Sequence, residues 1–352
     1  MNSEKNSTLI ILTPGFPGSE SDTVCLPMQQ SLVRAIKKNY PQLNIIILSF
    51  QYPYHSQTYT WFDTTVISFN GKNKGGLSRL LLRRKLMATL KDISHGKNIA
   101  GILSFWYGEC AWAGKKFAGK NNNGHYCWML GQDAKKGNKY VKNINLAPNE
   151  LIALSDFLQD EFEKNYGTRP RWVMPPGIDP TQFSNPGKEK DIDIIAAGSL
   201  IPLKQYEIFV KVIAEIKKHI PGIKVMLIGD GPEKNKLKKL VGDLGLGANI
   251  VFAGELSHPE VLVHMQRGRI FLHTSAYEGF GVVNLEALHA GCHVISFCKP
   301  MKKDIEHWHI VSNQEEMTEK TLKILQKNII YKSVTPFSMD DTAKKLMGLF
   351  SF

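Results

Sequence analysis

Cysteine is scarce in the sequence, and metal-binding patterns are missing. The five cysteines are Cys25, Cys110, Cys127, Cys292 and Cys298. They form no C-x-x-C pair and are odd in number, which favours neither a disulfide framework nor a zinc site. No cluster of Asp, Glu or His has the spacing of another metal site. We therefore expect no metal and no cofactor, with reduced and mostly buried thiols in a cytoplasmic protein.

Long apolar runs are also missing. No segment approaches the ~18 consecutive apolar residues of a membrane-spanning helix. The N-terminal run LIILTPGF is short, breaks at Pro14-Gly15 and lacks a small-residue cleavage site. It therefore predicts a first strand and not a signal peptide. At 352 residues the chain is long enough for two α/β domains, each with a full core.

Acidic residues are too few to balance the basic ones. The formal net charge is +12, which predicts an anionic partner such as nucleic acid, acidic lipid or a sugar nucleotide. Nucleic acid is disfavoured as a partner, because the sequence has neither an RNP-like aromatic signature nor a helix-turn-helix pattern.

Much of the positive charge is concentrated between residues 72 and 97, where eight lysines and arginines stand against one acid, Asp92. Residues 77–90 of this stretch predict a basic amphipathic helix. Its leucines are expected mainly on one side and its arginines toward the flanks: Leu77, Leu80, Leu81, Leu82, Leu86 and Leu90, with Arg79, Arg83 and Arg84. Such a helix can lie on an anionic membrane surface, here the inner face of the membrane. The alternative is a core helix with a solvated basic side.

The first part of the chain, residues 1–180, alternates strands and helices. Strands are expected at 7–14, 43–51, 99–107 and within 124–133, helices at 26–39 and 110–120, and the alternation continues through 145–167. This order predicts a parallel sheet covered on both faces. The run Pro175-Pro176-Gly177-Ile178-Asp179 predicts a turn, and we place an interdomain linker at about 180–190.

The second part, residues 190–336, repeats the alternation. Strands are expected at 191–200, 223–231, 249–255 and 293–297, and helices at 205–220, 232–245 and 259–268. The spacing Ser257-His258-Pro259-Glu260 is that of a capping box. This succession predicts a doubly wound Rossmann domain, whose ligands bind beyond the carboxyl ends of the strands.

The stretch TSAYEGFGVVNLEALHAG, residues 274–291, joins an apolar strand through a glycine-flanked loop to a helix that stops at Gly291. A helix start entered through glycines presents free backbone N–H groups and a positive dipole end, which suits a phosphate or diphosphate. Glu278 precedes the helix and Glu286 lies inside it, on the order of 10 Å apart along the axis. They can hold the hydroxyl groups at two ends of one elongated ligand. The alternative is two ordinary glutamates near a helix start.

This pattern, E-G-F-G-x-x-x-x-E preceded by Ser275 and followed by A-x-x-A-G, resembles the donor-site signature of the retaining glycosyltransferases of family four. The segment LIGDGPEKNKL, residues 227–237, is also similar to that family. The resemblance covers nearly the whole chain and is strongest at 145–291. It implies an α/β protein of GT-B fold, with two Rossmann-like doubly wound domains facing a cleft. The amphipathic run 337–352 would then be a C-terminal helix that crosses back onto the N-terminal domain.

The resemblance also implies roles for residues of the second domain. Glu278 would bind the donor hexose, Glu286 the ribose hydroxyls, and Lys204, in the loop after strand 191–200, the donor phosphates. The donor contacts that it implies are Gly18, Ser199, Lys204, Glu278, Gly279, Phe280, Gly281, Val282, Val283 and Glu286. Family members commonly have arginine where this chain has Ser199, so one cationic contact to the donor is missing here or is supplied elsewhere.

In the first domain the resemblance places Gly18 and Ser19 near the donor phosphates and the acceptor. Many family members have a histidine near the cleft where this chain has Leu130. The neighbouring Gln132 and Asp133 are polar and can bind sugar hydroxyls, with Asp133 as a candidate proton acceptor. The alternative is that they form an Asx turn before a basic loop.

Together these features predict a retaining, metal-independent hexosyltransferase that acts in cell-surface polysaccharide biosynthesis. It would use a nucleotide sugar, a UDP-sugar in preference to a GDP- or ADP-sugar, and a saccharide or lipid-linked saccharide acceptor. Glu278, Lys204 and Asp133 are the expected catalytic residues. The alternatives are a catalytically silent sugar-nucleotide-binding protein, motivated by Leu130 and Ser199, and a nucleotide-sugar epimerase.

Overall fold

The computed structural model describes residues 7–183, 189–327, 329 and 331–352. The chain forms two compact units. Unit 1 consists of residues 1–177 and 337–352, and unit 2 of residues 178–336. The division between Gly177 and Ile178 lies slightly before the predicted boundary, and residues 184–188 of the predicted linker lie outside the described residues.

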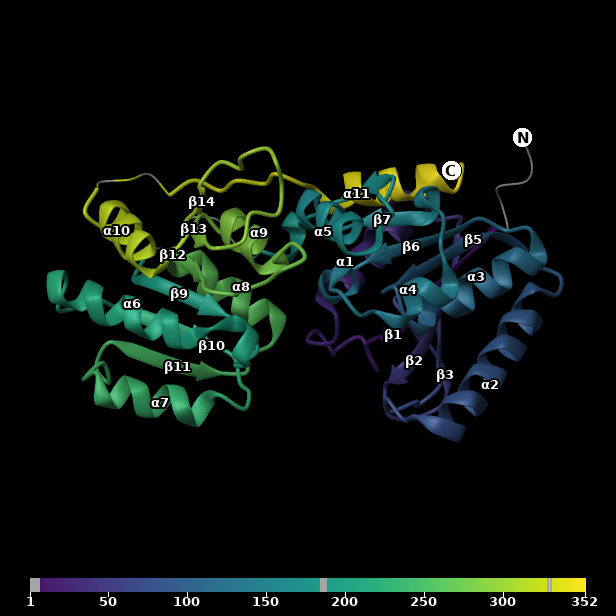
Figure 1. The fold of residues 1–352 in the computed structure, drawn as a ribbon, viewed down its shortest axis with the longest axis horizontal. Helices are drawn as coiled ribbons and strands as arrows, with labels where there is room; N and C mark the ends of the chain where they lie inside the picture. The colour runs from purple at the N-terminus through teal and green to yellow at the C-terminus, as the bar shows by residue number, and fades with distance from the viewer. Residues whose placement is uncertain (1–6, 184–188, 328, 330) are drawn as a thin grey trace. The chain divides into compact units, whose positions relative to one another are not determined.

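Unit 1 is built on an eight-stranded sheet with the order β3-β4-β2-β1-β5-β6-β7-β8 (Figure 1). Its strands are β1 (Ser7–Gly15), β2 (Asn44–Tyr52), β3 (Thr58–Trp61), β4 (Thr64–Ser68), β5 (Asn98–Phe105), β6 (His125–Met129), β7 (Leu151–Ala153) and β8 (Trp172–Val173). Its helices are α1 (Pro27–Asn39), α2 (Gly76–Ser94), α3 (Glu109–Asn121), α4 (Lys139–Ile144), α5 (Asp156–Tyr166) and α11 (Met339–Leu349). The continuous apolar runs of β1 and β2 are almost fully buried, as in strands covered on both faces.

Strands β3 and β4 form an antiparallel hairpin, so the expectation of a wholly parallel sheet is wrong at this edge. The turn residues Phe62 and Asp63 have φ of 40° and 56°. Two-residue hairpin turns need positive φ at both positions and normally carry Asn-Gly. Tertiary contacts hold this one instead. The Phe62 ring lies 4.4 Å from the Arg34 guanidinium carbon, and the Phe62 N–H donates to Glu20 Oε1 at 3.0 Å.

Helix α2 only partly matches the predicted leucine face. Leu86 and Leu90 are buried in the unit 1 core beside α3. Leu77, Leu80 and Leu81 are 72%, 46% and 54% exposed. The prediction that the leucines lie mainly on one side is therefore wrong. With 3.6 residues per turn, Leu77, Leu80 and Leu81 fall on the side opposite Leu86 and Leu90, and only the latter side packs on the domain. No described helix is both long and apolar enough to cross a membrane.

Helix α11 belongs to unit 1, where it packs against α1. It buries Met339, Ala343 and Leu346, while Leu349 is half-buried. The Tyr126 hydroxyl donates to the Leu349 carbonyl at 2.9 Å. The chain therefore returns to unit 1 after it has formed unit 2.

Unit 2 is built on a six-stranded parallel sheet with the order β11-β10-β9-β12-β13-β14. Its strands are β9 (Ile192–Ala197), β10 (Val225–Ile228), β11 (Ile250–Gly254), β12 (Gly268–His273), β13 (His293–Ser296) and β14 (Trp308–Ile310). Its helices are α6 (Tyr206–His219), α7 (Lys234–Asp243), α8 (His258–Arg267), α9 (Val282–His289) and α10 (Gln314–Leu325). In sequence order this is the 3-2-1-4-5-6 arrangement of doubly wound nucleotide-binding domains.

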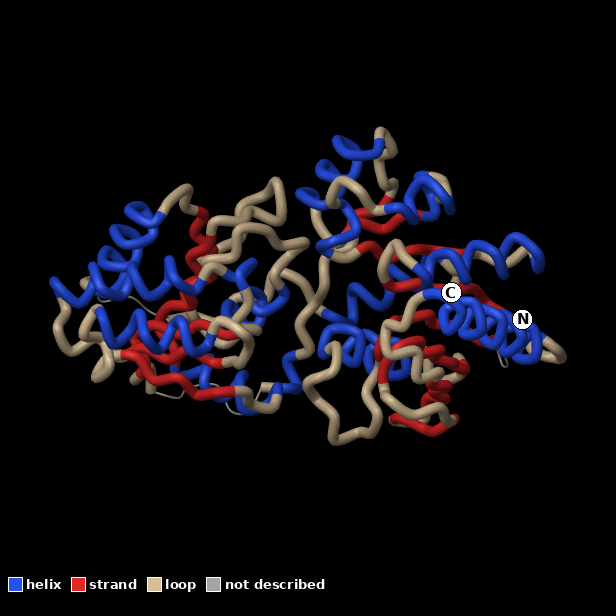
Figure 2. The backbone as a smooth tube through the Cα atoms, turned by 60° about the horizontal axis from the view of Figure 1, so that its bottom comes forward, coloured by secondary structure: helices blue, strands red, loops and turns tan. Residues whose placement is uncertain are grey.

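Helices cover both faces of the unit 2 sheet, and Figure 2 shows the strands of each unit among helices. On one face Ile194 joins a core cluster with Phe209 and Ile213 of α6. On the other face α8 packs against β9 and β12. Helix α8 begins at the predicted capping box, in which the Ser257 N–H donates to Glu260 Oε2 at 2.8 Å. The alternation of strands and helices predicted for this part of the chain is thus present.

Candidate functional site

The switch point of the unit 2 sheet lies between β9 and β12, where the strand order reverses. Ligands of doubly wound domains bind at such a point, beyond the carboxyl ends of the strands. The loop 198–204 after β9 and the loop 274–281 after β12 meet here. The Thr274 hydroxyl donates to the Lys204 carbonyl at 2.8 Å, and the Ala276 N–H donates to the Leu203 carbonyl at 3.1 Å.

Lys204 and Glu278 form the charged centre of this switch point. Lys204 Nζ lies 2.5 Å from Glu278 Oε1, and the side chains are 19% and 17% exposed. His273, the last residue of β12, places Nε2 3.4 Å from the same oxygen. Burial raises the pKa of Glu278, but the hydrogen bond from His273 and the charge of Lys204 outweigh burial and hold the pKa at about 2. Glu278 is therefore ionised at neutral pH.

His273 is held neutral in this network. It is fully buried, and burial lowers its pKa. The neutral ring can donate from Nε2 to Glu278, while its Nδ1 has no partner among the described residues. His273 thus restrains the Glu278 carboxylate without adding a second positive charge beside Lys204.

The loop after β9 packs closely on the loop after β10, because both contain glycine where no side chain fits. Gly198 and Gly229 have φ of 149° and 135°, and a Cβ on Gly229 would lie 2.0 Å from the Gly198 carbonyl oxygen. The Leu200 N–H donates to the Asp230 carbonyl at 2.8 Å. These contacts fix the backbone that carries Lys204 and leave Ser199 exposed.

Helix α9 begins directly after Gly281, whose φ is 79°. No side chain caps the first turn, which contains Val282 and Val283. Asn284 is 1% exposed, and neither polar atom of its amide has a partner in the described part of the chain. Its Nδ2 would lie 2.6 Å from a Cβ on Gly281. A buried amide without a partner is costly, so the start of α9 has unused hydrogen-bonding capacity in addition to its dipole.

Glu286 lies further along α9 and has a partner of its own. Its Oε1 is 2.8 Å from Nε2 of His258, the first residue of α8, and the two side chains are 14% and 16% exposed. Glu278 and Glu286 therefore contact different residues. His258 fixes the Glu286 carboxylate from a neighbouring helix.

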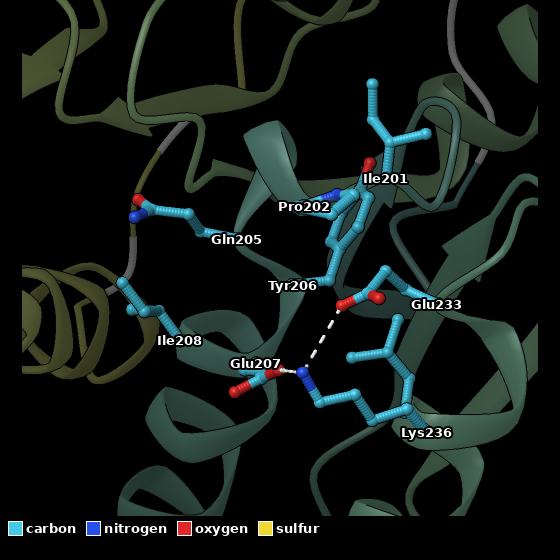
Figure 3. Close-up of a pocket in the computed structure, with 9 residues that line it drawn as sticks. Ile201, Pro202, Gln205, Tyr206, Glu207, Ile208, Glu233 and Lys236 are labelled. Atoms are coloured by element: carbon cyan, nitrogen blue, oxygen red, sulfur yellow. Dashed lines mark hydrogen bonds and ion pairs between the residues drawn. The ribbon is translucent and has the colours of Figure 1, made fainter.

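A cavity of about 290 Å³ borders the loop 198–204 and the first turns of α6 and α7. It is lined by Ile201, Pro202, Gln205, Tyr206, Glu207, Ile208, Glu233, Lys236 and Leu237. Figure 3 shows Lys236 between Glu207 and Glu233, and it pairs with both carboxylates. None of the predicted site residues lines this cavity, and this lysine is already paired, so we assign the cavity no part in the site.

Unit 1 has a larger cavity, of about 500 Å³, at its own switch point between β1 and β5. Its walls come from the last residues of β1 and β2, from the segments that follow β4, β5 and β6, and from the first turn of α2. The lining residues are Pro14, Phe50, Gln51, Asn73, Arg79, Trp106, Tyr107, Gly108, Glu109, Cys110, Gln132, Asp133, Lys135, Lys136, Asn138 and Tyr140. The predicted acceptor-side residues Gln132 and Asp133 thus lie in one cavity.

Asp133 is 6% exposed in the wall of this cavity. The Leu130 N–H donates to its Oδ2 at 2.8 Å. Burial raises the pKa of Asp133 to about 7, against the lowering effect of the backbone hydrogen bonds from Leu130 and Tyr107. A carboxylate with such a pKa can accept and release a proton near neutral pH. Leu130, which replaces the histidine of many family members, contributes a backbone group to this arrangement.

Glu109, at the start of α3, is the other carboxylate of the unit 1 cavity. Arg83 Nε lies 2.7 Å from its Oε1, and the Gln51 amide donates to its Oε2 at 3.3 Å. Arg83 also donates to the Tyr140 hydroxyl at 3.1 Å, and its guanidinium carbon lies 4.6 Å from the Trp112 ring centroid. Arg83 is therefore an internal residue of unit 1, although the sequence pattern predicts it at the flank of a membrane-facing helix.

Gly18 and Ser19 lie in the loop after β1 but do not line the unit 1 cavity. The Gly18 N–H donates to Asp22 Oδ2 at 3.3 Å, and the Ser19 and Ser21 hydroxyls lie 2.9 Å apart.

Sequence reasoning missed four residues of the two sites: His258, His273, Trp106 and Glu109. Two of them had a usable signal. His273 is a polar residue at the end of an apolar strand, where a doubly wound domain places its ligand, and His258 lies within the capping box. The pairing of each histidine with a glutamate depends on tertiary structure.

Comparison with known proteins gives a family match for one part of the chain. Residues 178–334 match the family described as glycosyl transferases group 1, which corresponds closely to unit 2. A poly(glycerol-phosphate) alpha-glucosyltransferase of Bacillus subtilis (strain 168) is 31% identical over 120 residues, which is 34% of this chain and 17% of that protein. A GDP-mannose-dependent alpha-(1-6)-phosphatidylinositol monomannoside mannosyltransferase of Mycobacterium tuberculosis is 24% identical over 175 residues, 44% of this chain and 46% of that protein. The matches therefore span less than half of each relative's length.

Solved structures show the same fold over nearly the whole chain. A glycosyltransferase from Rickettsia africae ESF-5 has a TM-score of 0.73 at 16% identity and covers 98% of both chains. The Anabaena protein HepE, in complex with UDP and glucose, has a TM-score of 0.72 at 17% identity and covers 98% of this chain and 99% of that one. With its two doubly wound units, the chain has the GT-B fold.

Proposed function

We propose that this chain, whose residues 178–334 belong to the glycosyl transferases group 1, is a retaining glycosyltransferase. It would move a hexose from a nucleotide diphosphate sugar to a glycan or lipid-linked acceptor. The observation that carries the proposal is the Lys204–Glu278 pair at the unit 2 switch point, beside the uncapped start of α9. The matched relatives are named for poly(glycerol-phosphate) and phosphatidylinositol monomannoside acceptors, which supports a role in cell-surface glycan biosynthesis.

The unit 2 residues supply what departure of a nucleoside diphosphate requires. Negative charge grows on the leaving phosphate as the glycosidic bond breaks, and preorganised donors and cations stabilise it. Lys204 and the backbone N–H groups of Gly281, Val282 and Val283 would provide this stabilisation. The remaining loop contacts would come from Ser199, Gly279 and Phe280. Because Lys204 and these N–H groups would stabilise the departing diphosphate, the proposal includes neither metal nor cofactor.

The two glutamates of unit 2 would orient the donor. Both accept hydrogen bonds only, since an ionised carboxylate has no proton to donate. Glu278, held by Lys204 and His273, would bind the transferred hexose. Glu286, held by His258, would bind the ribose. Restraint of each carboxylate before the donor arrives lowers the entropy cost of binding.

The unit 1 cavity would receive the acceptor. Asp133, with its pKa of about 7, would accept the proton of the attacking hydroxyl, and Gln132 would bind neighbouring hydroxyl groups. Gly18 and Ser19 remain proposed contacts from the loop after β1.

The proposal is tested in two steps on the full chain. A panel of UDP-, GDP- and ADP-sugars is first screened by thermal shift, because a ligand that binds only the native state raises its stability. Release of free nucleoside diphosphate is then measured with candidate acceptors. The exposed Lys211 of α6 supplies a matched control: Lys204→Gln should lower turnover by about 10²–10³-fold, and Lys211→Gln should not change it.

Three results would count against the proposal. If no nucleotide sugar of the panel raises the melting temperature, the proposed donor site is refuted. A donor that binds but is never consumed would favour a silent binding protein. Conversion of the donor into another nucleotide sugar without an acceptor would favour an epimerase.

We also propose that the first half of α2 attaches reversibly to an anionic membrane surface on the cytoplasmic side. Leu77, Leu80 and Leu81 are exposed there, beside the exposed Arg84 and Lys85. Each basic residue near such a surface contributes about 1 kcal/mol. The variant Leu77→Gln/Leu81→Gln/Arg84→Gln should sediment less with phosphatidylserine vesicles, while Lys91→Gln at the far end of α2 should not change sedimentation. An unmodified protein that ignores these vesicles at low salt would contradict the proposal.

A further inference from the structure

The unit 1 cavity contains more positive charge than its own carboxylates compensate. Arg79, Lys135 and Lys136 line it together with Glu109 and Asp133. Glu109 already pairs with Arg83, which lies outside the lining. Asp133 accepts hydrogen bonds from the backbone N–H groups of Leu130 and Tyr107. Neither carboxylate forms an ion pair with Arg79 or Lys136 within the described residues.

Arg79 and Lys136 are the cations that a ligand can reach. Both are exposed, and neither forms an ion pair within the described residues. They come from different segments, the first turns of α2 and the loop after β6, and they converge on one cavity. Exposed basic residues are common on a chain with a net charge of +12. Here, however, they border a concave surface with low-dielectric walls, which focuses their field on the cavity.

Trp106 provides an aromatic surface in the same cavity. It is half-buried and has φ of 66°, in the left-handed region that bulky side chains rarely adopt. Its N–H donates to the Trp128 carbonyl at 3.1 Å, which ties the strained residue to the neighbouring strand. Backbone strain of this kind is concentrated at binding and active sites. The strained backbone keeps a large apolar surface beside the polar groups of the cavity.

We propose that the unit 1 cavity binds a sugar that carries a negatively charged group, with the ring against Trp106 and the charged group at Arg79 and Lys136. The inference rests on the proposed function, in which this cavity receives the acceptor, and it names the charge class of that acceptor. Arginine and lysine side chains form charge-assisted hydrogen bonds with both phosphate and carboxylate oxygens. The Gln132 amide, which also lines the cavity, has donors and an acceptor for ring hydroxyls.

Four small probes separate the parts of this proposal: glucose 6-phosphate, glucuronate, methyl glucoside and inorganic phosphate. Their binding to the full chain is measured by calorimetry and ligand-observed NMR, without a nucleotide sugar. We expect glucose 6-phosphate, glucuronate or both to bind about tenfold more tightly than methyl glucoside, as a charged hydrogen bond allows. Which of the two binds better distinguishes a phosphorylated from a carboxylated acceptor. Inorganic phosphate alone should bind more weakly than glucose 6-phosphate.

Two matched double variants assign the charge effect to the cavity. Arg79→Gln/Lys136→Gln should remove the preference for the charged sugar and leave binding of methyl glucoside unchanged. Lys91→Gln/Lys139→Gln removes the same charge from α2 and from α4 but lies outside the cavity lining, so it should keep the preference. Trp106→Gly keeps the positive φ without strain. It should weaken binding of the charged sugars and of methyl glucoside, and leave binding of inorganic phosphate unchanged.

Equal binding of charged and neutral sugars would overturn the inference, as would an equal loss of preference in both double variants. So would the absence of charged-sugar binding at millimolar concentrations. Glucose 6-phosphate that binds no better than inorganic phosphate would leave only an anion site. None of these measurements depends on turnover, so the inference can fail while the donor is still consumed. Conversely, a chain that consumes no donor but retains the charge preference would refute only the proposed reaction.

Discussion

The two units have the same plan but prepare their switch points differently. In unit 2 the charged groups are already paired, Lys204 with Glu278 and Glu286 with His258, and glycine loops pack without space for a side chain. In unit 1 the switch point is an open cavity in which Arg79 and Lys136 have no carboxylate partner among the described residues. A fixed site suits a ligand with constant parts, such as a nucleoside diphosphate, whereas an open one suits a ligand that differs between related proteins. The family match, which covers only residues 178–334, follows the same division.

The largest expected effect is on turnover, and it comes from breaking the Lys204–Glu278 pair. Lys204→Gln should lower the rate at saturating donor by about 10²–10³-fold, the usual cost of removing one group that stabilises transition-state charge. Release of nucleoside diphosphate measures it, with Lys211→Gln as the control. An unchanged rate together with a lower melting temperature would make Lys204 a structural residue.

The next effect is on stability and contrasts a packed glycine with an open one. In Gly229→Ala the new methyl group would collide with the Gly198 carbonyl oxygen, and Gly229 itself has a positive φ that alanine disfavours. The free energy of unfolding should therefore fall by about 2 kcal/mol or more. Gly108 lies in the lining of the unit 1 cavity, and a Cβ placed on it would have no other atom within 4 Å. Gly108→Ala should therefore be tolerated. Denaturant unfolding of the two variants compares them, and equal losses would contradict the difference drawn between the units.

A smaller effect is expected on donor affinity. Glu286→Ala should weaken donor binding by about tenfold to a hundredfold, because hydrogen bonds to a charged, half-buried group are worth roughly 1–3 kcal/mol. Calorimetry with the donor identified in the panel measures this change. Glu215→Ala on α6 is a control with an exposed carboxylate. Donor affinity that stays the same in Glu286→Ala would refute the ribose assignment.

The smallest effect is a dependence of stability on pH that originates in unit 1. Burial raises the pKa of Asp133 to about 7, so between pH 6 and pH 8 the native state releases a proton that the unfolded state has already lost. Stability should therefore fall by about 1 kcal/mol over this interval, and Asp133→Asn should remove this part of the fall. Glu278 behaves oppositely: its pKa is held near 2, so its contribution is present above the unfolded pKa and is lost as the pH falls through about 2. Urea unfolding at pH 6 and pH 8 tests the Asp133 effect without interference from Glu278.

Periodicity and turn residues predicted most strands and helices of unit 2, for example α6 from its apolar face and α8 from its capping box, but not β14 or α10. The hairpin of β3 and β4 could not be predicted, because its turn at Phe62 and Asp63 has no Asn-Gly signal and is held by Glu20 and Arg34. In α2 the exposed Leu77, Leu80 and Leu81 lie on the side opposite the buried Leu86 and Leu90, which the 3.6-residue period specifies and the prediction of one leucine side overlooked.

The residues of the candidate site were likewise predicted only in part. The predicted motif residues Lys204, Glu278 and Glu286 lie around the unit 2 switch point. The partners His273 and His258 were missed, because a side-chain pairing over long sequence separation leaves no local pattern. Trp106 was missed for a related reason: its left-handed backbone is imposed by neighbouring strands.

The return of the chain to unit 1 has a consequence for protein synthesis. Residues 337–352 bury Met339, Ala343 and Leu346 against unit 1, and a Cβ on Gly101 of β5 would lie only 2.2 Å from the Phe350 ring. On the ribosome these residues are made after all of residues 178–336. The domain translated first is therefore the one that must wait for its final helix, while the intervening domain can fold independently as it emerges. A chain that ends before residue 337 and has been released from the ribosome should carry a protease-resistant unit 2 joined to an unfinished, chaperone-dependent N-terminal half.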